Sequence, residues 1–140
     1  MNLKRILAMV LVGIMAVLCL ASCGGAKTTV NVTLKINCND PDFPIILNVP
    51  VTVEKENPTV LDAFTIGCDA AEMAYVLDAN GESVLDIDEY KDHKDTETNT
   101  TYFWYYTING KEPSSGKAAD NVIADGDTIE YIYTAFVPEQ

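Results

Sequence analysis

The densest hydrophobic pattern in the chain lies between residues 101 and 136, and it predicts two neighbouring β-strands. Five consecutive aromatic residues occupy positions 102–106, and aromatic and β-branched residues favour half-buried strands. Side chains alternate between the two faces of a strand, so Trp104 and Tyr106 share one face while Phe103 and Tyr105 share the other. We expect this aromatic strand to lie inside a small sheet, flanked by the first and last strands.

Two stretches nearer the N-terminus also alternate between apolar and polar residues, as strands do. They cover residues 29–38 and 45–53, and Pro50 marks the second as an edge strand or a bulged one. A helix is predicted to start after Thr59, because Thr59 and Asp62 have the spacing of a capping pair. Apolar residues at helical spacing follow this start, so the first two strands lead into one helix.

A turn signal and a polar stretch separate this helix from the aromatic strand. Residues 78–81 read Asp-Ala-Asn-Gly between two short apolar segments, which predicts a hairpin. Residues 88–100 are the most polar part of the chain, and we expect an exposed, mobile loop there. The order strand, strand, helix, hairpin, strand, strand predicts an α+β fold, in which one helix packs across a mixed sheet in a β-grasp arrangement.

The N-terminal segment has the pattern of a processing signal. Lys4 and Arg5 precede an apolar run over residues 6–20, and the run closes with Leu-Ala-Ser-Cys at 20–23. This ending resembles the lipobox of bacterial lipoproteins, in which the cysteine is lipidated and becomes the new N-terminus. A plain secretory signal or a membrane-spanning helix is the alternative, although a span needs roughly 20 apolar residues.

The resemblance to lipoproteins divides the chain into three parts. It implies a signal peptide at 1–22, a lipidated tether at 23–28 with Cys23 as the lipidation site, and one domain at 29–137. The lipid would anchor the domain to the bacterial cell membrane, outside the cytoplasm.

The charge of the chain limits its partners. It has 9 basic and 21 acidic residues and a formal net charge of −12. Such a charge repels nucleic acid, so no nucleic-acid partner is expected. Solubility alone is an alternative explanation of the charge.

Two cysteines of the chain after the signal peptide remain once Cys23 is assigned to lipid. Cys38 and Cys68 are not in a zinc-ligand spacing, and disulfides persist outside the cytoplasm. If the helix runs across the sheet toward the end of the first strand, its later turns bring Cys68 close to Cys38. We therefore predict a disulfide between them. The alternative is a reduced pair, with Cys68 filling the helix face as a small hydrophobe.

Three separated motifs carry a resemblance to a known family. They cover residues 58–64, 103–110 and 124–130, and the last reads Ala-Asp-Gly-Asp-Thr-Ile-Glu. Their order and spacing resemble the transcobalamin-like C-terminal domain family, whose members are β-grasp domains of bacterial surface and secreted proteins. In the animal cobalamin carriers this domain covers one face of the corrinoid. The resemblance spans roughly residues 28–136 and implies a corrinoid or another small molecule as a ligand.

The candidate ligand-binding residues come from the aromatic strand and from the loop that follows it. An aromatic face can stack on a flat ligand or a sugar. We expect one face of the strand to be core, which makes the other face, with Phe103 and Tyr105, the better ligand candidate. In the family the loop that follows the aromatic strand faces the corrinoid. The alternative for this loop is that it is only a surface connection between two strands. The candidates are Phe103, Trp104, Tyr105, Ser114, Ser115 and Gly116.

The sequence favours a binding module over an enzyme. It has one histidine, and it lacks a Gly-x-Ser-x-Gly motif and a phosphate loop. His93 lies among acidic residues, but a lone histidine in a charged loop is more often solvated than metal-bound, and no calcium-loop pattern is complete. We expect no metal, no cofactor and no catalysis. A structural or protein-interaction domain of the cell envelope, without a small ligand, is the alternative function.

Overall fold

The computed structural model describes residues 25–38 and 47–139. The expected signal peptide and Cys23 lie outside these residues. Within them, no helix is long and apolar enough to cross a membrane. The elements are β1 (Thr28–Cys38), β2 (Leu47–Lys55), α2 (Val60–Ala70), β3 (Tyr75–Leu77), β4 (Val84–Ile87), β5 (Tyr90–Lys91), β6 (His93–Asp95), β7 (Thr100–Ile108) and β8 (Thr128–Phe136).

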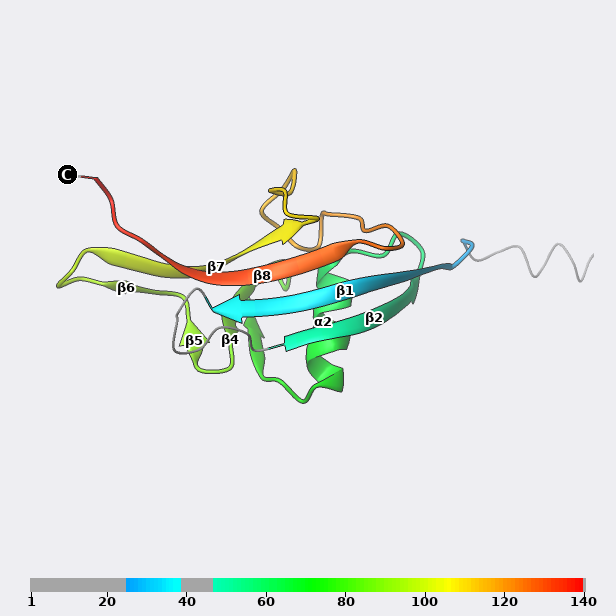
Figure 1. Cartoon of the computed structure of the whole chain (residues 1–140), viewed down its shortest axis with the longest axis horizontal. Helices are drawn as coiled ribbons and strands as arrows, with labels where there is room; N and C mark the ends of the chain where they lie inside the picture. Colours follow the sequence, from blue (N-terminus) through cyan, green and yellow to red (C-terminus); the bar gives the residue numbers. More distant parts are fainter. Residues whose placement is uncertain (1–24, 39–46, 140) are drawn as a thin grey trace, which may run out of the picture.

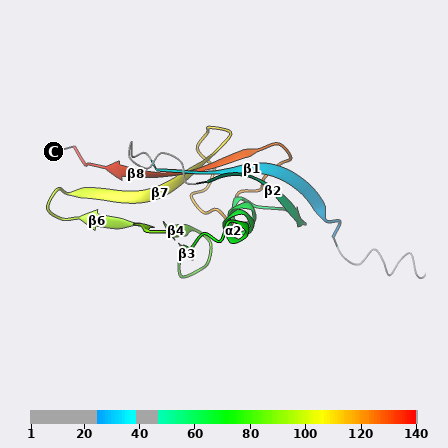
Figure 2. The same ribbon diagram turned by 60° about the horizontal axis from the view of Figure 1, so that its bottom comes forward.

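The strands form two sheets, and the helix packs on the larger one. The larger sheet has the order β2-β1-β8-β7-β6, and the smaller has the order β3-β4-β5. β1 and β8 are parallel, whereas the other neighbours are antiparallel. Figures 1 and 2 show α2 on one side of the larger sheet, with β3 and β4 beside it on that side. The expected mixed sheet with one helix is therefore confirmed, within a fold that is mostly β.

The core lies between the helix and this face of the sheet. The apolar residues of β1 and β8 alternate inward, and Leu34, Ile36 and Ile129 are fully buried among them. From the helix, Phe64 packs its ring 4.7 Å from that of Tyr131. The alternation read from the sequence thus identified the buried faces of the long strands.

The aromatic strand is interior to the sheet and lies beside the last strand, as predicted, but the first strand is not its other neighbour, which corrects that part of the prediction. β7 lies between β8 and β6, and it is β8 that pairs with β1. β8 has this central place because Ile129 and Tyr131 are buried against the helix side. On its outer edge β7 pairs with β6 only over residues 100–102.

The polar stretch 88–100 is not a loop throughout, and this prediction also needs correction. It contains β5 and β6, and β6 forms a ladder in which His93 lies opposite Tyr102 and Asp95 opposite Thr100. The ring of His93 stacks on that of Tyr102, with the centroids 4.7 Å apart. Backbone pairing at an edge needs no apolar side chains, so hydrophobic periodicity did not reveal these strands.

The helix begins where the sequence predicts, and a glycine lets it approach the sheet closely. Thr59 is the N-cap, and the side chains of Thr59 and Asp62 each accept a hydrogen bond from the other's backbone N–H. Gly67 lies inside the helix, and a Cβ there would stand 2.5 Å from Cδ2 of Leu34. A Cβ at this position would have to displace the tip of the Leu34 side chain, so glycine permits the close contact although it is a poor helix former.

The edge strand and the hairpin follow the prediction. β2 is the outer strand of the larger sheet, and Pro50 pairs opposite Thr33 within it. β3 and β4 form the predicted hairpin around residues 78–81, where the N–H of Asp78 donates to the carbonyl of Ser83 at 2.9 Å.

No disulfide joins Cys38 and Cys68 in the described part of the chain, which corrects the predicted bridge. The helix crosses β1 at Leu34, where Gly67 touches it, and ends at Ala70. It therefore does not reach the end of β1, where Cys38 lies. Cys68 is a small core residue instead, and burial raises the pKa of its thiol to about 12.

Candidate functional site

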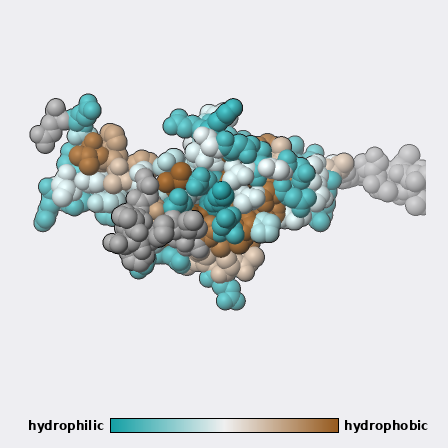
Figure 3. Space-filling model, in the orientation of Figure 1, coloured by the Kyte–Doolittle hydropathy of each residue, from teal (hydrophilic) through white to brown (hydrophobic). Residues whose placement is uncertain are grey.

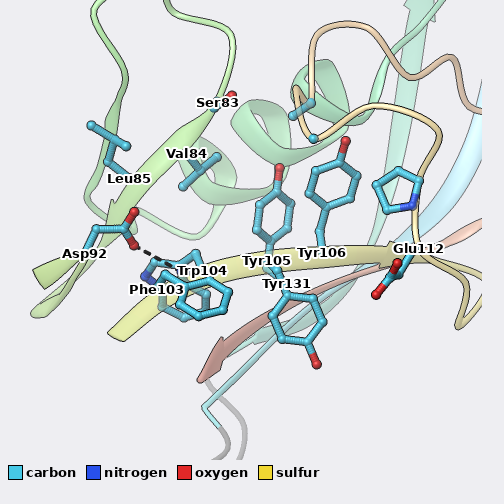
Figure 4. Close-up of a pocket in the computed structure, with 13 residues that line it drawn as sticks. Ser83, Val84, Leu85, Asp92, Phe103, Trp104, Tyr105, Tyr106, Glu112 and Tyr131 are labelled. Atoms are coloured by element: carbon cyan, nitrogen blue, oxygen red, sulfur yellow. Dashed lines mark hydrogen bonds between the residues drawn. The ribbon is translucent and has the colours of Figure 1, made fainter. Parts of the chain in front are cut away.

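A pocket of about 610 Å³ opens between β7, β4 and the loop at residues 112–118. This size falls within the range of small-molecule sites. Figure 4 shows the aromatic side chains of β7 together with Val84 and Leu85 of β4. The residues that line the pocket are Ser83, Val84, Leu85, Asp92, Phe103, Trp104, Tyr105, Tyr106, Glu112, Pro113, Gly116, Ala118 and Tyr131.

Four of the six predicted ligand residues reach this pocket. Phe103, Trp104 and Tyr105 line it from β7, and Gly116 lines it from the loop. Trp104 is 7% exposed, whereas Tyr105 is 37% exposed. A ligand can therefore reach the ring of Tyr105 more readily than that of Trp104.

Trp104 is held firmly as part of the core. Its Nε1 donates a hydrogen bond to the carbonyl of Tyr90 at 2.9 Å. Its ring packs against those of Tyr133 and Tyr90, with centroids 5.0 and 6.3 Å away. The indole therefore presents a fixed apolar surface to the pocket.

Ser114 and Ser115 are not among the lining residues, and their side chains serve the loop. The hydroxyl of Ser114 donates to Oδ1 of Asn121 at 3.1 Å, and that of Ser115 donates to Oδ2 of Asp120 at 3.0 Å. The Ser115 hydroxyl also accepts from the N–H of Lys117 at 3.2 Å. These serines therefore stabilise the loop that forms one wall of the pocket, without lining the pocket themselves.

Asn121 joins the loop to β7, a role that no sequence pattern indicates. It is 6% exposed. Its Nδ2 shares its two hydrogens among three acceptors, the hydroxyl of Tyr106 at 2.6 Å and the carbonyls of Ser115 and Lys117 at 2.7 and 2.9 Å. The hydroxyl of Tyr106 in turn donates to the carbonyl of Ser115 at 3.1 Å. Nothing in the polar run around Asn121 distinguishes it from a solvated loop residue.

The small sheet forms the opposite wall and is tied to the same loop. Lys117 Nζ lies 2.6 Å from Oε2 of Glu82, and the N–H of Ala119 donates to the carbonyl of Glu82 at 3.2 Å. Val84, buried behind this connection, gives the wall an apolar side chain.

Two carboxylates give the pocket a negative rim. Oδ1 of Asp92 accepts a hydrogen bond from the backbone N–H of Trp104 at 3.1 Å (Figure 4), and Glu112 is exposed on the loop. Desolvation raises the pKa of Asp92, and the neighbouring Asp86 adds to this, against the lowering effect of the bond from Trp104. A cation is favoured at this rim over an anion.

The floor also contains a buried phenol. Tyr131 is 2% exposed, and its hydroxyl has no hydrogen-bond partner within the described residues. Burial raises the pKa of this phenol well above its ordinary value, so it stays neutral.

The edge of β7 that borders the pocket is open. The N–H of Trp104 points away from β8, toward Asp92. The N–H and C=O of Ile108 also point away from β8: the N–H donates to the carbonyl of Lys111 at 3.0 Å, and the C=O accepts from the N–H of Lys111 at 3.1 Å. Backbone direction alternates along a strand, so Tyr106 also points its N–H and C=O outward. No strand in the described ranges pairs with this edge beyond Tyr102.

Other surfaces of the described chain offer less chemistry. Figure 3 shows hydrophobic residues gathered over α2 and β2, where a second pocket of about 340 Å³ lies beside Val49, Val51 and Ile66. Among the described residues, no group of three or more His, Cys, Asp or Glu side chains is placed to hold a metal ion.

The comparisons with known proteins assign no family. No protein-family model matches the chain. No curated protein matches it either. Among solved structures, the chain is similar to a crystal structure from Ruminococcus gnavus that is described as a "putative metal binding protein". The two are 13% identical with a TM-score of 0.48, and the match covers 76% of this chain and 98% of the other.

Proposed function

We propose that the protein is a lipid-anchored extracytoplasmic binding module without catalytic activity, and that the pocket beside β7 is its ligand site. The observation that carries the proposal is the gathering of residues 103–106, four consecutive aromatics, on one pocket of small-molecule size. The lipobox pattern ending at Cys23 supports the anchor.

The arrangement of the strands supports the finer fold assignment within this proposal. A parallel pair, β1 and β8, lies between β2 and β7, and α2 packs across it. This is the arrangement expected of a β-grasp domain of the transcobalamin-like C-terminal type. The three motifs of that family lie at the start of α2, along β7 and at the start of β8.

A corrinoid or another ring-bearing small molecule is the proposed ligand. Tyr105 and the half-buried Phe103 offer ring surface at the mouth of the pocket, and aromatic rings stack on flat ligands. The pocket would enclose part of a corrinoid and leave the rest outside, as expected of a domain that covers one face of its ligand.

Equilibrium dialysis of the protein against cyanocobalamin tests this function. We expect saturable binding by the wild type and an affinity lower by roughly tenfold for Tyr105→Ala, because the ring offers stacking area. Val76→Ala, at an exposed position outside the pocket, is the matched control and should bind like the wild type. No binding by the wild type would reject the corrinoid, and equal binding by all three proteins would reject the pocket beside β7 as its site.

A protein-interaction module of the cell envelope is the second candidate. The observation that favours it is the open edge of β7, since exposed edges pair readily with other chains.

A further inference from the structure

The open edge of β7 indicates what kind of partner the second candidate would bind. We propose that an extended peptide with alternating apolar side chains and a basic end adds to β7 as a new strand inside the pocket. The inference rests on the proposed role of this pocket as the binding site, but it does not need a corrinoid.

The backbone of β7 supplies the hydrogen bonds for such an added strand. Tyr106 directs both its N–H and its C=O outward, and Trp104 directs its C=O the same way. The N–H of Trp104 already has an anionic acceptor in Asp92. An added strand would therefore find a complete donor–acceptor pair at Tyr106 and one more acceptor at Trp104.

Around Tyr106 this edge lacks the features that normally block strand addition, although Asp92 caps the N–H of Trp104 and Lys111 pairs with Ile108. Proteins protect their edges with proline, charged side chains, bulges or a covering segment. The other outer edge of the sheet, β2, carries Pro50. Along the open part of β7 the side chains are aromatic, and β6 pairs with β7 only as far as Tyr102.

The two walls leave room for a chain with side chains on both faces. Residues of an added strand would alternate between the floor, beside Trp104 and Val84, and the opposite face, beside Phe103 and Tyr105. The open stretch covers residues 103–106, or about 13 Å at about 3.3 Å per residue. A peptide of four residues would fill it, and a hexapeptide, about 20 Å long, would extend past its ends.

The charge of the rim selects a basic partner. Asp92 and Glu112 line the pocket, and the chain as a whole has a net charge of −12. Lys117, a basic residue of the neighbouring loop, is held by Glu82 at 2.6 Å. A peptide with lysine at its ends complements these carboxylates, whereas a peptide with glutamate there is repelled.

The test uses the full-length, ¹⁵N-labelled protein in detergent micelles and a capped hexapeptide, Lys-Val-Thr-Val-Thr-Lys. We expect the hydrogen exchange of the Tyr106 amide to slow by at least about tenfold at saturation, because it gains a hydrogen bond. The Tyr105 amide, which faces β8, is the internal control and should not change. Binding that leaves Tyr106 unprotected, or no binding at millimolar peptide, would overturn the inference.

Matched peptides and variants make the test specific. The same hexapeptide with glutamate for lysine should bind at least about tenfold more weakly, and equal binding would refute the charge argument. In a bound strand the N–H groups of the valines point to one edge of the peptide and those of the threonines to the other. One peptide N-methylated at both valines and one N-methylated at both threonines therefore test the two edges separately. If neither peptide binds more weakly than the parent, strand pairing is excluded. Gly116→Trp, where a new Cβ meets nothing within 4 Å, should block the pocket, whereas Val122→Trp, outside the pocket, should not.

Dialysis against cyanocobalamin in the same preparation separates this inference from the first proposed function. Corrinoid binding without protection of Tyr106 by the peptide rejects strand addition alone. Protection of Tyr106 without corrinoid binding supports strand addition and rejects the corrinoid. If neither probe binds, both proposals fail.

Discussion

Replacing Asn121 with alanine should loosen the loop that forms one wall of the pocket. The substitution removes the hydrogen bonds from Nδ2 to Tyr106, Ser115 and Lys117, all between 2.6 and 2.9 Å. At about 1 kcal/mol net for each bond at a buried site, the loss of unfolding free energy comes to about 2–4 kcal/mol. Urea denaturation followed by the fluorescence of Trp104, the one tryptophan, measures it.

Two controls show whether the network is the cause. Ser114→Ala removes only the bond from Ser114 to Oδ1 of Asn121, and should cost less than about 1 kcal/mol. A double-mutant cycle between Asn121→Ala and Tyr106→Phe should give a coupling of about 1 kcal/mol, because the two side chains contact each other. If Asn121→Ala costs no more than Ser114→Ala, other contacts hold the loop and our account of this wall is wrong.

Three further substitutions test the core, the helix contact and the anchor. Trp104→Ala should destabilise the protein by about 3–5 kcal/mol in urea denaturation, because the ring is buried; a loss near zero would contradict its core role. Gly67→Ala should lower the free energy of unfolding by about 1–3 kcal/mol because the new Cβ would press on Leu34. Helix propensity alone predicts that this substitution raises the free energy of unfolding, and that result would show that the Leu34 side chain moves aside without cost. Cys23→Ala should abolish lipid labelling and shift the protein out of the membrane fraction on blots; unchanged labelling would refute lipidation at Cys23.

The sequence predicts the long strands and the helix of this fold because one face of each is buried, so apolar residues recur at a regular spacing along it. The alternation from Val30 to Ile36 and the capping pair at Thr59 are both direct consequences of the local geometry. The order of the strands is a different matter, since β7 and β8 have equally apolar patterns. Only packing against the helix, through residues such as Tyr131, decides that β8 and not β7 lies at the centre of the sheet.

The pocket could be predicted only in the part that β7 supplies and at Gly116 of the loop that follows it. The aromatic run at 102–106 indicates the part from β7 because it is too dense for an ordinary surface. Val84, Asp92 and Asn121 come from segments that meet β7 only in three dimensions, and a buried asparagine in a polar loop leaves no periodic signal. The predicted disulfide failed for a related reason, because the point where the helix crosses β1 depends on packing at Gly67.

The most direct test of the ligand site is a map of amide chemical shifts in the ¹⁵N-labelled protein, recorded with and without saturating cyanocobalamin. We predict that the largest changes fall in residues 83–85, 103–106 and 112–118, which surround the pocket. No change anywhere in the spectrum would reject the corrinoid as the ligand. Largest changes at residues 49–52 and 66–71, around the second pocket, would contradict the central claim that this protein binds its ligand beside β7.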